Sequence, residues 1–177
     1  MFTPAKVTFT SRSYKLADHF FPPVIDSPAL SGAAVVIAHP WTSVKEHSPA
    51  HYARVLSQAG FYCLAHDAAY QGESEGEPRY LEDPGQGVED IKSAVTYLAS
   101  RDEIDSEKIG VLGIGASGGY VSFTAQTDLR IKAVAISAGV RSGTMGRRGL
   151  DKDGSNLDIL RTQLEAAARD RSSGREG

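Results

Sequence analysis

The chain has 177 residues, which is enough for one domain with a sizeable core and too few for two ordinary domains. Apolar residues make up 41% and charged residues 23%, as in globular proteins, which excludes a disordered chain and a coiled coil. The formal net charge is -3 and the Lys and Arg residues are scattered, so we expect no nucleic-acid partner.

Two further features bear on location and metal binding. No apolar run approaches the ~20 residues that cross a bilayer, and the start MFTPAKVTF lacks a charged segment followed by an apolar one. We therefore expect a cytoplasmic protein with no membrane partner. Cys63 is the only cysteine and lies in an apolar run, so we expect it in the core and expect no disulfide, no metal site and no cofactor.

The first part of the chain predicts a hairpin followed by a buried strand. Residues 6–10 and 15–21 are short β-rich runs separated by a polar turn, which favours antiparallel pairing. Residues 33–38 (AAVVIA) are apolar at every position, as in a parallel strand that is buried on both faces. The C-terminal end of such a strand is where we expect chemistry.

Two helices flank the next strand. Ser48, as N-cap before a first-turn proline, begins a helix that Gly60 ends. Residues 61–65 predict a second buried strand, which a long surface loop follows. A second helix then covers about residues 84–100, capped by Asp83.

Strand and helix continue to alternate after this point. Residues 108–114 and 131–138 predict two more buried strands, and residues 120–126 predict a helix. The alternation predicts the α/β class, with a mostly parallel sheet and helices on both faces. We place this core in residues 1–150 and assign residues 151–177 to a C-terminal helix and a frayed tail, RDRSSGREG.

The most informative segment is KIGVLGIGASGGY, residues 108–120. A strand that enters a glycine-rich turn and then a helix is typical of a nucleophile elbow, in which the helix N-terminus helps to stabilise an oxyanion. Gly115, Ser117 and Gly119 satisfy the G-x-S-x-G pattern. Ser117 is therefore a candidate nucleophile.

The same glycines allow other interpretations. Gly113, Gly115 and Gly118 also satisfy G-x-G-x-x-G, which would indicate an NADP-dependent oxidoreductase with Arg141 near a 2′-phosphate. No acid follows about 20 residues later, which weakens this interpretation. Alternatively, the glycines only allow close packing of a helix on the sheet. A Walker P-loop is excluded because no Gly-Lys-Ser/Thr closes the turn.

Two earlier loops fit the elbow interpretation. The first buried strand ends in His39-Pro40-Trp41, where a second oxyanion N–H donor is needed. Pro40 has no N–H, so Trp41 is the expected donor. We favour a role for His39 in fixing this loop by local hydrogen bonds over a role as a base. Asp67, after the second buried strand, is more suited to bracing its loop than to reacting.

Four segments together resemble one known group of proteins. They are residues 39–40 (HP), 44–46 (VKE), 70–79 (YQGESEGEPR) and 109–120 (IGVLGIGASGGY). In them the chain resembles the α/β-hydrolases related to dienelactone hydrolase, including the YcjY-like proteins, over about residues 5–150. The resemblance implies a small-molecule acyl substrate, an ester, lactone or similar compound, with the reactive position at the turn.

The chain departs from that group at the turn. Members read G-I-C-A-S-G-G-Y, and this chain has Gly115 in place of the cysteine. We favour the register with the elbow tip at Gly115, in which the nucleophile is replaced and Ala116 supplies an oxyanion N–H. In the other register Ser117 is the nucleophile and Gly118 supplies that N–H. From the turn alone, Ser117→Ala is expected to change the free energy of unfolding by less than about 1 kcal/mol.

The expected fold is truncated after about strand six. The catalytic acid and histidine of this fold follow later strands, and none of the five histidines comes after the turn. We therefore expect a protein of hydrolase lineage with an incomplete catalytic triad, weak or inactive as this chain. A non-catalytic protein that keeps the small-molecule pocket is a further alternative.

Overall fold

The structure is a computed structural model that describes residues 3–149 and 157–174. The chain falls into two compact units, Met1–Val140 and Arg141–Gly177. The first unit contains β1 (Ala5–Ser11), β2 (Tyr14–Phe21), β3 (Ala34–Ala38), α1 (Ser48–Gln58), β4 (Tyr62–His66), α2 (Pro84–Ala99), the short 3-10 helix η1 (Ser106–Lys108), β5 (Ile109–Ile114), α3 (Ser117–Thr127) and β6 (Ile131–Ser137).

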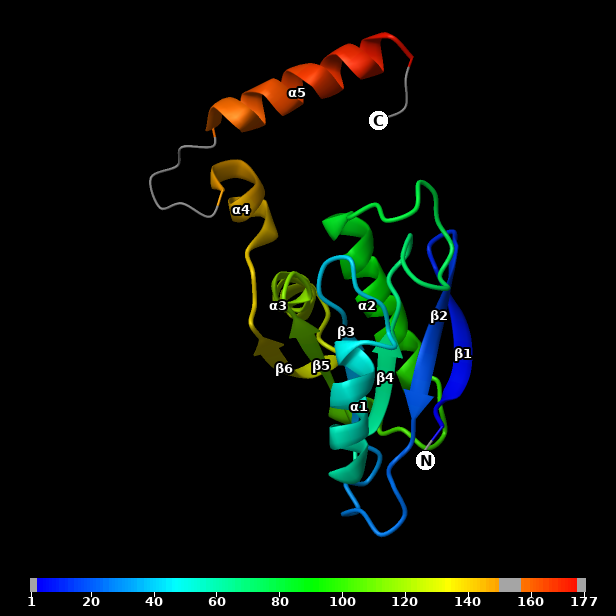
Figure 1. The fold of residues 1–177 in the computed structure, drawn as a ribbon. Helices are drawn as coiled ribbons and strands as arrows, with labels where there is room; N and C mark the ends of the chain where they lie inside the picture. The colour runs from blue at the N-terminus through cyan, green and yellow to red at the C-terminus, as the bar shows by residue number, and fades with distance from the viewer. Residues whose placement is uncertain (1–2, 150–156, 175–177) are drawn as a thin grey trace. The chain divides into compact units, whose positions relative to one another are not determined.

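Six strands form one sheet in the order β1-β2-β4-β3-β5-β6 (Figure 1). The hairpin β1-β2 is antiparallel and joins β4 in antiparallel fashion, whereas β4, β3, β5 and β6 run parallel to one another. The predicted α/β class and the parallel arrangement of these four strands are confirmed. Ala38 at the end of β3 lies opposite His66 of β4 and Gly113 of β5, so the loops that follow the three strands share one edge of the sheet.

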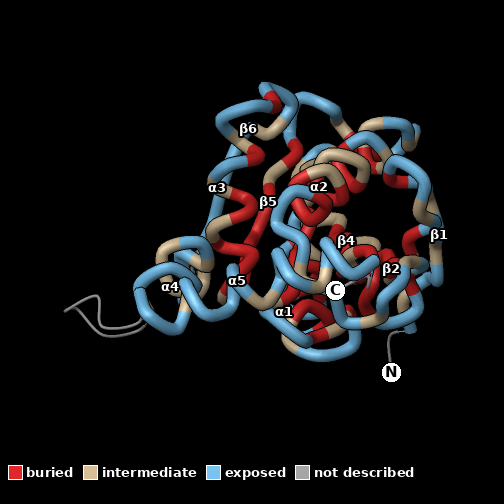
Figure 2. Tube along the Cα trace, turned by 90° about the horizontal axis from the view of Figure 1, so that it is seen from above, coloured by how far each residue is buried: buried red, intermediate tan, exposed pale blue. Residues whose placement is uncertain are grey.

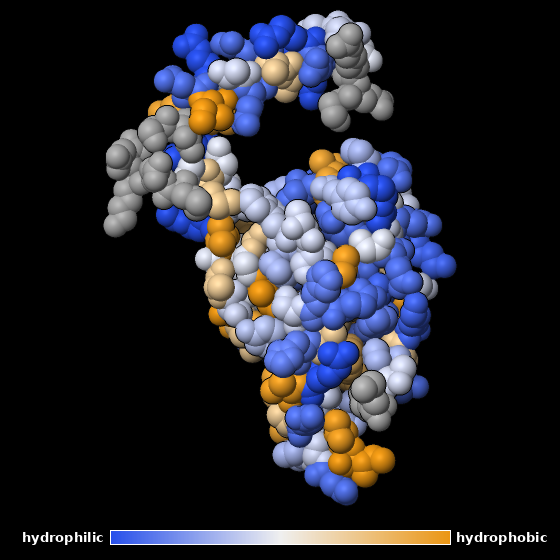
Figure 3. All heavy atoms as spheres, viewed as in Figure 1, coloured by the Kyte–Doolittle hydropathy of each residue, from blue (hydrophilic) through white to orange (hydrophobic). Residues whose placement is uncertain are grey.

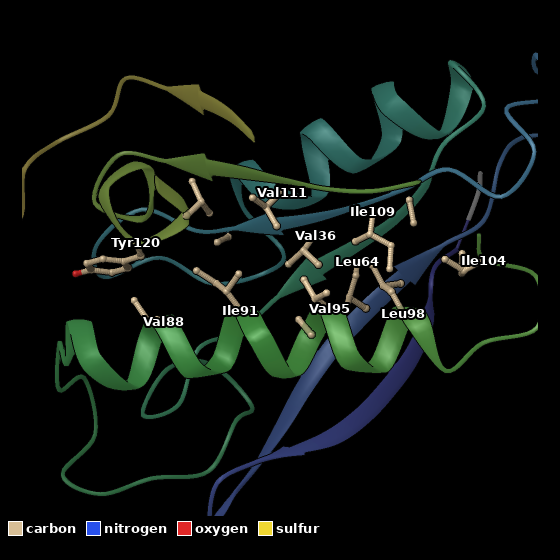
Figure 4. Close-up of a cluster of buried hydrophobic side chains, with 14 of the residues drawn as sticks. Val36, Leu64, Val88, Ile91, Val95, Leu98, Ile104, Ile109, Val111 and Tyr120 are labelled. Atoms are coloured by element: carbon tan, nitrogen blue, oxygen red, sulfur yellow. The ribbon is translucent and has the colours of Figure 1, made fainter. Parts of the chain in front are cut away.

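Alternating side chains divide the core into two layers. Val36 and Leu64 point to the face that α2 and α3 cover, where they pack with Ile91 of α2 (Figure 4). Ile37 and Cys63 point to the opposite face, which α1 covers. Burial of each large aliphatic side chain contributes about 1.5–3 kcal/mol, so the two apolar layers hold the sheet and its loops in place.

The two helix starts have different physical origins. The carboxylate of Asp83 accepts hydrogen bonds from the N–H groups of Gly85 at 2.8 Å and Gln86 at 3.1 Å, so the predicted cap of α2 is confirmed. The predicted N-cap of α1 is wrong, because His47 holds that position and Ser48 is the first helical residue. The first-turn proline fixes the backbone there, and the helix begins without a side-chain cap.

β6 differs from its prediction. Residues 131–138 were expected to form a strand buried on both faces, but β6 is exposed over most of its length, and the side chain of Ile136 is 52% exposed (Figure 2). Within the described residues β6 is an edge strand that pairs with β5 alone. An apolar sequence pattern indicates that a strand can be buried, but the strand becomes buried only where neighbouring elements cover its faces.

The second unit is helical. It contains α4 (Ser142–Arg148), which was not predicted, and α5 (Leu157–Ser172), the predicted C-terminal helix. The tail from Arg169 was expected to be frayed, yet α5 continues to Ser172. The expected boundary between residues 150 and 151 lies outside the described residues.

None of the described helices is long and apolar enough to cross a membrane. The face in Figure 3 is mostly hydrophilic, with hydrophobic residues in small groups.

Candidate functional site

The turn between β5 and α3 is tightest at Gly115. Its φ of +60° lies in the left-handed region that L side chains rarely adopt. Its N–H donates to the carbonyl of Ser137 at 2.9 Å, and its own carbonyl accepts from the N–H groups of Gly118 and Val140. A Cβ at position 115 would lie 2.9 Å from Cβ of Pro40, in the loop after β3. A left-handed backbone at this position is what we expected of an elbow tip, and glycine places no side chain there.

Ser117 lies in a different environment, at the first position of α3. The residue is 5% exposed, and its hydroxyl donates a short hydrogen bond to the backbone carbonyl of His39. A serine needs a general base within hydrogen-bond reach to become a nucleophile. Here the hydroxyl proton is held by a carbonyl oxygen, so the hydroxyl ties α3 to the loop after β3.

Both ring nitrogens of His39 make local hydrogen bonds. Nε2 accepts from the N–H of Ala68 at 3.2 Å, which leaves the proton on Nδ1 to be donated to the carbonyl of Pro40 at 2.7 Å. Burial lowers the pKa of His39, which keeps this ring neutral. The arrangement fixes the loop, as in the role that we favoured from the sequence, and leaves neither nitrogen for the hydroxyl of Ser117.

Two backbone N–H groups beside the turn have no hydrogen-bond acceptor within the described residues, those of Trp41 and Ala116. The N–H of Gly118 instead donates to the carbonyl of Gly115 at 3.0 Å. Free N–H groups next to an elbow can stabilise a negatively charged oxygen. Of the three predicted oxyanion donors, Trp41 and Ala116 thus have N–H groups that can bind a ligand oxygen.

The side chain of Trp41 belongs to a polar cluster that the sequence did not predict. Its indole N–H donates to the hydroxyl of Tyr120 at 3.3 Å, and this hydroxyl donates to Oε1 of Glu82 at 2.6 Å. Burial raises the pKa of Glu82, although the hydrogen bond from Tyr120 lowers it. The cluster joins the loop after β3, helix α3 and the loop before α2, three segments that no local pattern relates.

The other glycines of the turn allow close packing. A Cβ at Gly113 would lie 2.3 Å from the backbone oxygen of Ser117, and one at Gly118 would lie 2.8 Å from Cα of Gly139. Protein backbone therefore fills the space beside both glycines. This favours helix-to-sheet packing over a phosphate-binding loop, in which the space beside the glycines admits the ligand.

Asp67 braces the loop after β4. Its carboxylate accepts from the backbone N–H and from Nζ of Lys45, each at 2.6 Å, and from the N–H of Glu73 at 3.1 Å. The side chain of Lys45 is 1% exposed and also contacts Glu46 at 3.0 Å. Burial lowers the pKa of Lys45, but its carboxylate partners raise it by more. The burial of Lys45 was not predicted, since Lys is rarely buried and its partner Asp67 is 22 residues away in the sequence.

One group of side chains within the described residues has the composition of a metal site. Potential ligand atoms of His19, Glu46 and Glu73 lie within 4.8 Å of one another. The ammonium group of Lys45 contacts both carboxylates, and that of Lys6 lies 3.0 Å from Glu73. Lys45 also pairs with Asp67, so two ammonium groups lie among three carboxylates in one ion-pair network.

Comparison with known proteins relates the chain to larger proteins. No protein-family model matches it. It is 38% identical over 172 residues to the uncharacterized protein YcjY of Escherichia coli (strain K12), which covers 95% of this chain and 56% of that protein. The crystal structure of hypothetical protein PA2218 from Pseudomonas aeruginosa matches with a TM-score of 0.87 and 33% identity, over 97% of this chain and 54% of that one.

A third match concerns the fold. The crystal structure of the alpha/beta hydrolase GrgF from Penicillium sp. sh18 matches with a TM-score of 0.79 and 22% identity, over 99% of this chain and 57% of that one. The chain spans about half the length of the proteins that it matches.

Proposed function

We propose that this chain, which has the fold of α/β-hydrolases and is similar in sequence to YcjY, binds small acyl compounds and hydrolyses them weakly or not at all. The proposed ligands are esters, lactones or similar compounds whose carbonyl oxygen lies against the turn after β5. The fold, which the chain shares with the alpha/beta hydrolase GrgF, supports a hydrolase lineage.

One observation carries the proposal. The residue with the φ of an elbow tip is Gly115, which has no atom to attack a carbonyl carbon. The nearest hydroxyl, that of Ser117, donates to the carbonyl of His39. The frame for an acyl group remains beside them, because the N–H groups of Trp41 and Ala116 are free to donate to its oxygen.

A fluorophosphonate probe tests the catalytic part of the proposal, since it forms a covalent bond only with an activated nucleophile. We expect mass spectrometry to find the purified chain unlabelled, and we expect no hydrolysis of p-nitrophenyl acetate above the rate in buffer. Ser117→Ala is the matched control. Stoichiometric labelling that is lost in Ser117→Ala would place the nucleophile at Ser117 and overturn the proposal.

Trp41 allows the binding part to be measured separately, because it is the only tryptophan of the chain. Its emission reports on the loop beside the turn. We expect δ-valerolactone to cause a saturable change in fluorescence. No saturable change up to about 10 mM, the range of very weak ligands, would contradict a retained acyl pocket.

A further inference from the structure

His66, the last residue of β4, is a fully buried ring with one unsatisfied nitrogen. The residue is 1% exposed, and its Nδ1 lies 3.2 Å from a carboxylate oxygen of Asp18 on β2. The ring stacks between Phe9, with centroids 6.5 Å apart, and His39, at 6.4 Å. Nε2 has no hydrogen-bond partner among the described residues, and it is the one buried side-chain polar atom there of which this holds.

A small cavity adjoins His66. It has a volume of about 20 Å³ and lies between the ends of β3 and β4 and the first half of α2. Its polar lining includes His66, Asp90, Gln86 and Ser117. One water molecule needs roughly 10–15 Å³ of such volume and two to four polar partners. The cavity therefore has room for a water molecule and is too small for an acyl substrate.

Asp90 of α2 supplies the second partner in this cavity. It is fully buried, and its two oxygens accept from the N–H of Ala69 at 2.8 Å and from the side-chain amide of Gln86 at 2.7 Å. A carboxylate has about four acceptor positions. Two acceptor positions of Asp90 thus remain for a hydrogen-bond donor in the cavity.

The charge of His66 sets the direction of the hydrogen bond at Nε2. Burial lowers the pKa of His66, but the charge and hydrogen bond of Asp18 raise it by more, with smaller contributions from Asp90 and Asp67. The protonated ring donates from both nitrogens. Nε2–H then requires an acceptor, and an unmade hydrogen bond of a buried charged group costs more than the ~1–3 kcal/mol of a neutral group.

We propose that this cavity is a specific binding site for a single water molecule, which accepts from Nε2 of His66 and donates to Asp90. The water joins the end of β4 to α2 and completes a buried chain from Asp18 through His66 to Asp90. This site does not depend on the proposed acyl-binding function, because it lies beneath the turn and uses neither Gly115 nor Trp41.

A high-resolution crystal structure of the full chain tests the site, together with structures of Asp18→Asn and His66→Phe. Asn at position 18 keeps an acceptor for Nδ1–H but removes the charge that favours the protonated ring, so Nε2 of a neutral ring accepts from the water instead of donating to it. Phe keeps a ring at position 66 and removes both nitrogens. We expect one water about 2.7–3.2 Å from Nε2 in the wild type and in Asp18→Asn, and its loss in His66→Phe.

The wild-type and Asp18→Asn structures test the site even where His66→Phe does not fold. The absence of water from the wild-type cavity, or a protein group bonded to Nε2, would each overturn the proposal.

Discussion

Gly115→Cys places a thiol at the position where the turn has the backbone of an elbow tip. A non-glycine residue with left-handed backbone costs about 1–2 kcal/mol, and the new Cβ would lie 2.9 Å from Cβ of Pro40, so the loop after β3 must shift slightly. We expect the variant to fold with a free energy of unfolding reduced by about 1–3 kcal/mol.

The new thiol should be unusually acidic. It precedes the N-terminus of α3, where the helix dipole lowers a thiol pKa from about 8.5 to about 7 or below. At pH 7 about half of it would be thiolate, against roughly 3% of an ordinary thiol. A more acidic thiolate is also a weaker nucleophile, which lowers its rate of alkylation about fivefold. We therefore expect alkylation by iodoacetamide at pH 7 to be only about threefold faster, so the pH midpoint of the reaction is the sharper measurement.

The chain offers a low background and a matched control for this experiment. Burial raises the pKa of Cys63 to about 12, so at pH 7 only about one molecule in 10⁵ carries its thiolate. Gln126→Cys puts an exposed thiol in the last turn of the same helix, away from the positive end of its dipole. A midpoint for Gly115→Cys equal to that of Gln126→Cys, near pH 8.5, would refute the assignment of the elbow tip to Gly115.

Three further predictions concern the surroundings of the turn. The structure replaces the smaller change expected for Ser117→Ala from the turn alone: the variant should lower the free energy of unfolding by about 1–2 kcal/mol, measured by urea denaturation, because the carbonyl of His39 loses a buried donor. A change below about 0.5 kcal/mol would contradict the hydrogen bond. Gly118→Ala should cost about 1–3 kcal/mol by overpacking, since its Cβ would meet backbone at 2.8 Å, and unchanged stability would show that α3 packs less closely. Hydrogen bonds from Lys45 and Lys6 lower the pKa of Glu73 to about 2, so its contribution, below about 1 kcal/mol at this exposed position, is present above about pH 4.5 and is lost as the pH falls towards 2. Glu73→Gln should therefore be less stable than wild type at pH 7 and equal to it at pH 2, and a difference that persists at pH 2 would contradict this.

The sheet was predictable because its strands carry their own signal. Runs such as residues 33–38 and 109–114 are apolar at nearly every position, and a parallel strand covered by helices on both faces requires this pattern. The capping carboxylate of Asp83 was predictable for the same reason, since its partners are two and three residues away. Buried strands and helix caps depend on residues that are close together in the sequence, so the sequence alone is enough to predict them.

The buried charges were not predictable, because their partners are distant in sequence. Asp18 and His66 are 48 residues apart, and Lys45 and Asp67 are 22 apart. His66 at the end of an apolar run and Lys45 in a polar loop are both of a type that is usually exposed to solvent. Asp18 meets His66 because β2 pairs with β4. Lys45 meets Asp67 because the loop after β3 lies against the loop after β4.

The two registers of the turn illustrate the limit of a motif. The G-x-S-x-G pattern counts residue types and marks Ser117, whereas an elbow is defined by its backbone. Of residues 113–119, Gly115 alone has a positive φ, and Ser117 already belongs to helix α3. A serine on the first turn of the helix, bonded to the carbonyl of His39, stabilises the loop that carries the N–H of Trp41. In the function that we propose, the N–H groups that bind an acyl oxygen and the atom that attacks its carbon come from different residues, so glycine at position 115 removes the attacking atom and leaves the N–H groups in place.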